Sequence, residues 1–133
     1  MITLLLLLLR IMEISERYQC VTEVMKSKFI AILLPVESPE DFKKELTKLQ
    51  HEHSKARHIV YAYRIDNKTK SCDDREPKGT AGRPLLELLL KKDLNKTALI
   101  VVRYFGGTLL GSGRLLRTYV ASGVNVLKEA GIE

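Results

Sequence analysis

The 133-residue sequence has no tryptophan, only two cysteines and few aromatic side chains, which make up 6% of the chain. A core that is poor in large rings must be built mainly from Leu, Ile, Val and Ala. Cys20 and Cys72 lie far apart, with no Cys-x-x-Cys pair and no histidines at metal-ligand spacing. Nothing here requires a disulfide or indicates a metal site, so we expect two reduced, unreactive thiols in a cytoplasmic protein.

A long apolar run is also missing. The leucine run at residues 4–9 is far shorter than the roughly 20 residues that span a bilayer. A secretory signal would carry basic residues before such a run and a small-residue cleavage site after it, whereas here Arg10 follows the run. We therefore predict no membrane partner. Residues 1–11 are interpreted as an N-terminal extension or upstream start, and residues 12–133 as one domain.

Positive charge is concentrated in one half of the chain. The formal net charge is +6, but residues 54–117 contain 14 Lys and Arg against 6 Asp and Glu, so the remainder is slightly acidic. Such a basic half is typical of proteins with an anionic partner, for example RNA, phosphate or an acidic protein. On charge alone, a soluble surface that happens to favour lysine is the preferred explanation.

Alternating β-rich and amphipathic segments predict an α/β domain. Four strands are expected, near residues 18–25, 28–34, 57–65 and 97–105. Helices are expected at residues 38–54, 83–93 and 112–131, and a polar loop at residues 66–82.

This order, ββαβαβα, predicts an α+β two-layer sandwich with its helices packed on one sheet. Ser38 is expected to cap the first helix, with a serine cap and a terminal glycine on the last. Leu99, Val101 and Leu116 are predicted to be buried.

The segment RYFGGTLLGSGRLLRTY, residues 103–119, holds half of the eight glycines. It connects a strand to a helix through a glycine turn, and the free N–H groups of such a helix start bind anions. Arg103, Arg114 and Arg117 add donors suited to phosphate. The segment is neither a Walker loop nor a GxGxxG motif. For this segment alone, a tight strand-to-helix connection with solvated arginines explains the residues as well as an anion site does.

A second polar segment, DDREPKGTAGRP, precedes the middle helix. Asp73, Asp74 and Glu76 have the oxygen ligands of a divalent-cation site, although a solvated acidic loop is commoner. They are alternatively suited to pair with the arginines of the glycine segment. Thr80 is expected to cap the helix that follows. His58, at a strand start, is interpreted as a hydrogen-bonded structural residue rather than a general base.

The glycine-bearing blocks GTAGRP (residues 79–84) and RYFGGTLLGSGR (residues 103–114) are expected to meet in space, because each leads into a helix start and each carries arginine. The predicted anion or nucleic-acid site consists of Arg83, Arg103, Gly106, Gly107, Gly111, Gly113, Arg114 and Arg117. Beside it a secondary polar cluster is predicted from Asp73, Asp74, Glu76, Thr80 and His58. We expect no catalytic residue, metal or cofactor.

Four blocks together resemble the YigZ/Impact family, in order and spacing: SKFIA, ARHIVYAYRI, DDREPKGTAGRPLLELL and VVRYFGGTLLGSGRLLRTY. The resemblance covers about residues 21–127. It implies the fold shared by elongation factor G domain IV and the GHMP kinases, which contains a left-handed βαβ crossover. Two positions depart from the family pattern: Arg75 and Arg114 each stand where a glycine is usual.

The resemblance also implies a role near translation. Eukaryotic Impact proteins are translational regulators that bind a large activator of a stress-responsive kinase, and bacterial members have been thought to bind nucleic acid or ribosomal components. Bacterial relatives usually add a ferredoxin-like domain, whose contribution is expected to be absent from these 133 residues. We therefore expect a regulatory protein that binds RNA, the ribosome or a translation-control protein. The alternative is a nucleotide-binding enzyme with Asp73 and Asp74 as metal ligands, but the phosphate-loop lysine pattern and a recognisable base are both missing.

Overall fold

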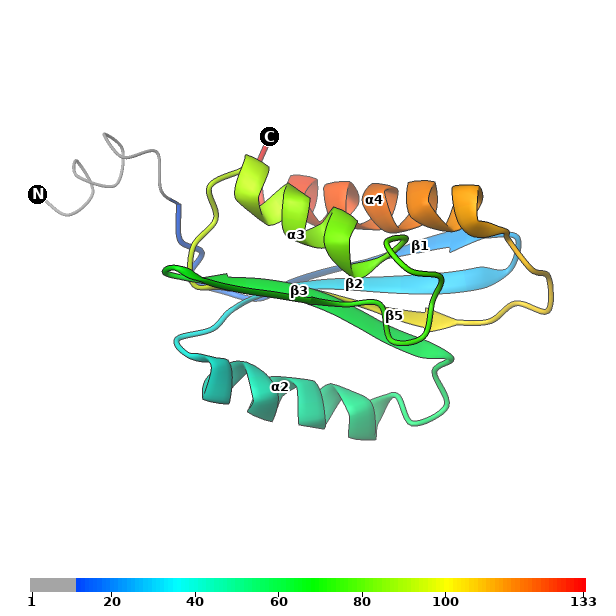
Figure 1. Cartoon of the computed structure of the whole chain (residues 1–133), viewed down its shortest axis with the longest axis horizontal. Coiled ribbons are helices and arrows are strands. Elements are labelled where there is room, and N and C mark those ends of the chain that lie inside the picture. Colours follow the sequence, from blue (N-terminus) through cyan, green and yellow to red (C-terminus); the bar gives the residue numbers. More distant parts are fainter. Residues whose placement is uncertain (1–11) are drawn as a thin grey trace, which may run out of the picture.

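One five-stranded sheet organises the computed structural model of the chain, which describes residues 12–133. Its strands are β1 (Tyr18–Val24), β2 (Ser27–Pro35), β3 (His58–Ile65), β4 (Lys68–Cys72) and β5 (Thr97–Tyr104). The helices are α2 (Pro39–Glu52), α3 (Gly82–Lys91) and α4 (Ser112–Glu129). Helices α3 and α4 cover one face and α2 the other (Figure 1). The predicted packing of helices on a single sheet is confirmed, but there are three layers rather than two.

Alternation along the strands builds a separate core on each face. In β5 every residue from Thr97 to Arg103 is buried. Leu99 and Val101 pack in the core under α3 and α4, whereas Ile100 and Val102 pack in the core under α2. The predicted burial of Leu99 and Val101 is confirmed. The predicted burial of Leu116 is wrong: its side chain is 39% exposed, because it lies on the outer side of α4.

Strand β4 was expected to be loop. All neighbouring strands pair antiparallel, in the order β1-β2-β5-β3-β4, which makes β4 an edge strand. Its residues are mostly exposed and polar, so it has no apolar alternation that a sequence could show. A two-residue turn at Asp66 and Asn67 sets its register against β3, and Asp66 has the positive φ that such hairpin turns need.

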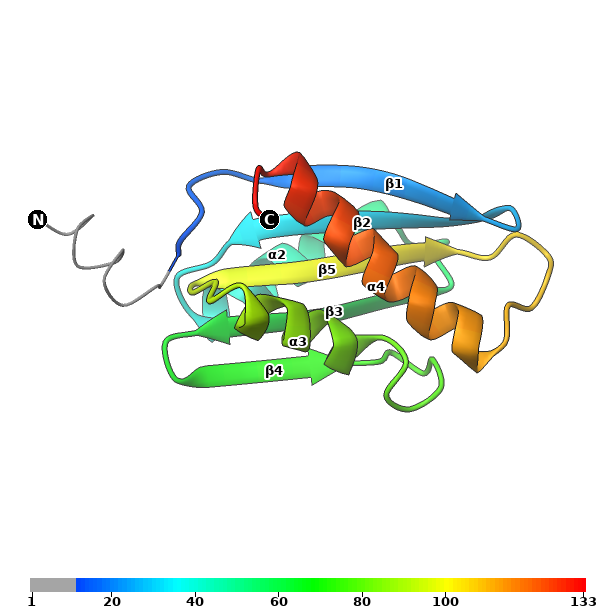
Figure 2. The same ribbon diagram turned by 90° about the horizontal axis from the view of Figure 1, so that it is seen from above.

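A left-handed crossover brings two loops together at one end of the sheet. Strands β4 and β5 both run antiparallel to β3, so they are parallel to each other. Helix α3 connects them across the face that also carries α4, with left-handed sense (Figure 2). The loop from β4 to α3, the loop from β5 to α4 and the start of β3 therefore share one edge of the domain.

The helix starts differ from their predictions in two of three cases. The Ser38 cap of α2 is confirmed, since its Oγ accepts a hydrogen bond from the Asp41 N–H at 3.1 Å. Thr80 does not cap α3, and Asp73 does so instead. The serine cap predicted for α4 is also wrong, because Gly111 takes that position with a φ of 80° and gives no side-chain bond. Among residues 12–133, no helix is both long and apolar enough to cross a membrane.

Candidate functional site

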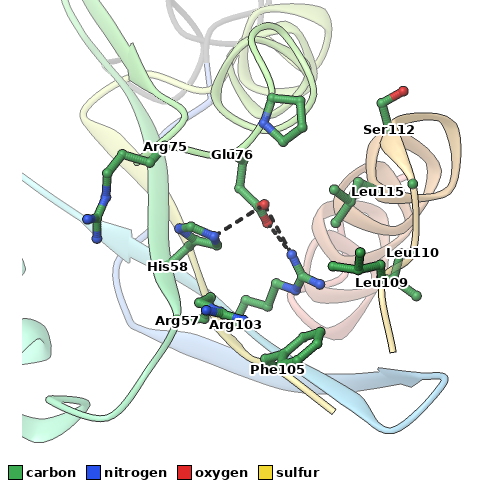
Figure 3. Close-up of a pocket in the computed structure, with 12 residues that line it drawn as sticks. Arg57, His58, Arg75, Glu76, Arg103, Phe105, Leu109, Leu110, Ser112 and Leu115 are labelled. Carbon is green, nitrogen blue, oxygen red and sulfur yellow. Dashed lines mark hydrogen bonds and ion pairs between the residues drawn. The ribbon is translucent and has the colours of Figure 1, made fainter. Parts of the chain in front are cut away.

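A cleft of about 490 Å³ opens where the two loops meet beside the start of β3 (Figure 3). Its charged lining comes from the start of β3, the β4–α3 loop and β5, and its apolar lining comes mainly from the β5–α4 loop and the first turn of α4. The lining residues are Arg57, His58, Arg75, Glu76, Pro77, Arg103, Phe105, Leu109, Leu110, Gly111, Ser112 and Leu115. Its volume is within the range of small-molecule sites, roughly 300–1,000 Å³.

A buried carboxylate, Glu76, lies at the centre of the cleft floor. Arg103 Nη1 donates to its two oxygens at 2.8 and 3.1 Å, and both side chains are at most 5% exposed. His58 Nε2 lies 3.4 Å from Glu76 Oε1. The Nδ1 atom of His58 donates to the Asp74 carbonyl at 2.7 Å. The hypothesis that the acidic loop pairs with an arginine of the glycine segment is therefore confirmed for Glu76, and His58 has the structural hydrogen bond expected of it.

Tyr119 completes this network and was not predicted from the sequence as a site residue. It lies one turn after Leu115 on the core-facing side of α4, and its hydroxyl donates to Glu76 Oε2 at 2.5 Å. Burial, followed by this hydrogen bond, raises the pKa of Tyr119 well above its usual value. The sequence did contain one indication, a tyrosine within the apolar stripe of a helix. A tyrosine that is buried there needs a hydrogen-bond partner for its hydroxyl.

The position of Tyr119 predicts a loss of stability at high pH. The folded state favours the neutral phenol, so its contribution is complete below the unfolded pKa of 10.0 and is lost as the pH rises above it. We expect the free energy of unfolding to fall above about pH 10, and to fall less steeply in Tyr119→Phe. Tyr61, whose pKa burial raises to about 12, keeps part of the dependence. Urea unfolding between pH 8 and 11 measures both slopes, and equal slopes would contradict the assignment.

The predicted site arginines do not converge on one point. Arg103 is buried in the pair with Glu76, because its place in the β5 alternation turns it under α4. Arg83 is exposed and pairs with Glu87 of its own helix at 3.3 Å. Arg114 contacts Met25 Sδ of the β1–β2 turn, and Arg117 lines a groove between α3 and α4. Helices α3 and α4, which start from the two predicted blocks, lie on one face of the sheet. The ion pair between the chain segments that lead into these helices is formed by Glu76, just before the GTAGRP block, with Arg103, and not by the exposed arginines.

Asp73 and Asp74 both serve the backbone. Asp73 accepts hydrogen bonds from the N–H groups of Gly79, Ala81 and Gly82 at 2.8–3.1 Å, which caps α3. Asp74 Oδ2 accepts from the Ile59 N–H at 2.7 Å. The Thr80 hydroxyl donates to the Pro77 carbonyl at 2.5 Å. Both carboxylates therefore order the loop backbone, and no group of three potential metal ligands occurs among the described residues.

The glycines of the β5–α4 connection have different roles. Gly106 packs against the backbone of Lys26 and donates its N–H to Ser27 Oγ at 3.1 Å. Gly107 and Gly111 have φ values of 93° and 80°, a region that side chains disfavour. Gly113 has no such constraint, since a Cβ there makes only an ordinary contact. The tight-connection interpretation thus explains three of the four glycines.

Arg75 occupies a backbone conformation suited to glycine. Its φ is 67°, and that of the preceding Asp74 is 44°. The turn therefore keeps the left-handed conformation despite the arginine, at a cost of roughly 1 kcal/mol. The exposed Arg75 and Arg57 flank the cleft, and with Phe105 they are lining residues that were not predicted from the sequence.

Comparisons with known proteins agree on one family. The family model for the Impact N-terminal domain matches residues 25–127. The IMPACT family member YvyE of Bacillus subtilis is 42% identical over 108 residues, covering 77% of this chain and 50% of YvyE. The IMPACT family member YigZ of Escherichia coli is 38% identical over 110 residues, covering 79% of this chain and 53% of YigZ. The chain thus spans about half the length of these relatives.

One solved structure shares the fold. A crystal structure described as that of a hypothetical protein superimposes with a TM-score of 0.82 and 32% identity, over 86% of this chain and 58% of the other. The two-domain translational regulator Yih1 matches with a TM-score of 0.49 and 25% identity, over 87% of this chain and 45% of the other. Because the family model covers most of the described residues, the chain belongs to the Impact family.

Proposed function

We propose that this chain is a translation-associated regulatory binding protein that contacts RNA, on or off the ribosome, through the basic surface at the start of α4. One observation carries the proposal. Arg114 and Arg117 are exposed, lie one turn apart on an 18-residue helix without a side-chain cap, and form no ion pair with any described residue. Guanidinium groups that have no acidic partner beside a helix amino end attract phosphate.

Two further points support this role. Residues 54–117, which lead into this surface, carry the excess positive charge of the chain. Membership of the Impact family adds the translational regulation that its eukaryotic members perform, and this role would place the chain in the cytoplasm. The enzyme alternative has less support, because Asp73 and Asp74 have no third potential metal ligand beside them among residues 12–133.

Salt dependence tests the RNA contact. In the double variant Arg114→Ala, Arg117→Ala we expect weaker binding to ribosomal RNA of any sequence, and a log–log salt slope that is shallower by about two units, because each phosphate contact releases about 0.9 counterions. Fluorescence anisotropy at several salt concentrations measures both quantities. The matched control is Lys43→Ala, Lys44→Ala, which removes the same charge from exposed positions of α2. Equal slopes in the two double variants would contradict the proposal.

Pull-down from lysate separates RNA from a protein partner. We expect ribosomal components to be recovered by the wild-type chain and lost both after ribonuclease treatment and in the α4 double variant. Recovery that survives ribonuclease would overturn RNA contact and identify a translation-control protein as the partner.

A further inference from the structure

One edge of the buried Arg103 guanidinium is free. Glu76 binds only its Nη1 atom, and Nε is buried without an acceptor among residues 12–133. The N–H groups of Nε and Nη2 lie on the edge of the guanidinium that binds an oxyanion with two parallel hydrogen bonds. A buried donor without a hydrogen-bond partner destabilises the folded chain, so an acceptor that enters the cleft and pairs with Nε is bound more tightly.

The amino end of α4 faces the same cleft. Gly111 and Ser112 line it, and no side chain of the described residues caps this 18-residue helix. The neighbouring helix α3 shows what such an end accepts here, since the Asp73 carboxylate fills the corresponding position. An anion between Arg103 and the first turn of α4 would therefore be held by backbone N–H groups as well as by the guanidinium.

We propose that this cleft binds a phosphate monoester, with the phosphate on the Nε–Nη2 edge of Arg103 and its organic group against Phe105 and Leu109. This small-ligand site is separate from the RNA surface of Arg114 and Arg117, and it does not depend on that surface.

Charge favours phosphate over a carboxylate. The cleft is lined by three arginines, Arg57, Arg75 and Arg103, and by one carboxylate, Glu76. Glu76 already accepts from Arg103 and Tyr119, so it faces the incoming anion as a neutralised group. Beyond the Glu76–Arg103 pair, Arg57 adds a positive charge at the cleft, whereas the Arg75 side chain points away from Glu76 (Figure 3). A phosphate monoester carries −1.5 to −2 at neutral pH, so it gains more from this positive charge than a carboxylate does.

The remaining wall favours a flat or apolar organic group. Phe105 is exposed and the Arg57 guanidinium lies 4.6 Å from its ring centre. Leu109 is 83% exposed beside it, on the same side of the cleft as Leu110 (Figure 3). A bound aromatic or apolar group would cover these side chains, and Arg57 could contact both its phosphate and the Phe105 ring.

Binding is tested by NMR on the 15N-labelled chain, with phenyl phosphate, inorganic phosphate and benzoate as probes. We expect phenyl phosphate to bind at least tenfold more tightly than either fragment, and to shift the Arg103 Nε–H signal and the amides of residues 111–113. Binding should weaken below about pH 6, where the phosphate gains a proton. Benzoate binding as tight as phenyl phosphate binding, or shifts elsewhere only, would overturn the proposal.

Variants locate the contacts. Arg103→Lys keeps the charge but removes the two-donor edge, and should lose phenyl phosphate binding. Because Arg103 is buried, its replacement can also impair folding. Phe105→Ala and Arg57→Ala therefore test the same cleft at exposed positions, and each should weaken phenyl phosphate binding about tenfold. Arg83→Ala, outside the cleft, should bind as wild type. Unchanged affinity in folded Phe105→Ala and Arg57→Ala would contradict the site.

The natural source of the phosphate is a free metabolite or the 5′ end of an RNA. An oligoribonucleotide with a 5′-phosphate that binds more tightly than its 5′-hydroxyl form, and shifts Arg103 Nε–H, identifies the RNA end. Shifts with phenyl phosphate alone identify a free ligand. The α4 double variant should keep phenyl phosphate binding, so failure of the RNA proposal and failure of this one are distinguished.

Discussion

Replacing Glu76 by glutamine is expected to destabilise the domain by about 3–5 kcal/mol, because it leaves Arg103 buried with no charge partner. Glutamine has nearly the same shape and keeps an oxygen for the Tyr119 hydroxyl, so the effect isolates the charge. Both side chains of the Glu76–Arg103 pair are at most 5% exposed, which keeps water from replacing the lost carboxylate. Urea unfolding of the variant at pH 7 gives the free-energy change directly.

The matched control is Glu87→Gln. Glu87 also pairs with an arginine, at 3.3 Å from Arg83, but both side chains are more than 60% exposed. Such a surface pair is worth about 0–1 kcal/mol, so this variant should be close to wild type. The double variant Glu76→Leu, Arg103→Leu should recover much of the stability lost in Glu76→Gln, since no buried charge remains. A Glu76→Gln chain as stable as Glu87→Gln would show that the buried pair with Arg103 does not contribute to stability.

Much of the architecture was predictable because periodicity reports burial. The continuous apolar run of β5 and the apolar stripe of α2 consist of side chains that pack in the core. Both elements lie where the sequence predicted them. β4 and the outer position of Leu116 were missed for the same reason. Strand β4 is an edge strand with one neighbouring strand, so its residues need not be apolar. Leu116 follows the buried Leu115 in the sequence, and its residue type alone does not show that its side chain faces outward.

The candidate site was predictable in its segments but not in its contacts. Both polar segments were identified, and both border the cleft. Which acid would cap α3, and which would meet Arg103, depends on the crossover that brings β4 and β5 into parallel alignment. Local sequence made Thr80 the nearest cap candidate, whereas the chain path brings Asp73 to the helix start. Glu76 contacts Arg103 and Tyr119, which lie 27 and 43 positions further along the chain. No pattern in the neighbouring sequence predicts contacts over such separations.

The second large effect is expected for Gly106→Ala, at about 3 kcal/mol or more. A Cβ on Gly106 would lie 2.2 Å from the carbonyl carbon of Lys26 and 2.4 Å from its oxygen. These are backbone atoms of the β1–β2 turn, where Met25 and Lys26 both have positive φ, so no side chain can rotate away. The turn and the β5–α4 connection would have to separate, which also breaks the bond from the Gly106 N–H to Ser27 Oγ.

Two other glycines of the same connection provide the controls for Gly106→Ala, measured by guanidinium unfolding. Gly107→Ala meets no atom within 4 Å but has a φ of 93°, so it should cost about 1–2 kcal/mol through backbone strain alone. Gly113→Ala lies in the first turn of α4 with only an ordinary contact to Arg117, and should be neutral or stabilising by up to about 1 kcal/mol. If close backbone contact sets the cost, the order of stability is Gly113→Ala, Gly107→Ala, then Gly106→Ala. A Gly106 variant as stable as the Gly107 variant would mean that the loop moves freely from the β1–β2 turn, and that the wall of the cleft formed by residues 105–111 is not fixed by this contact.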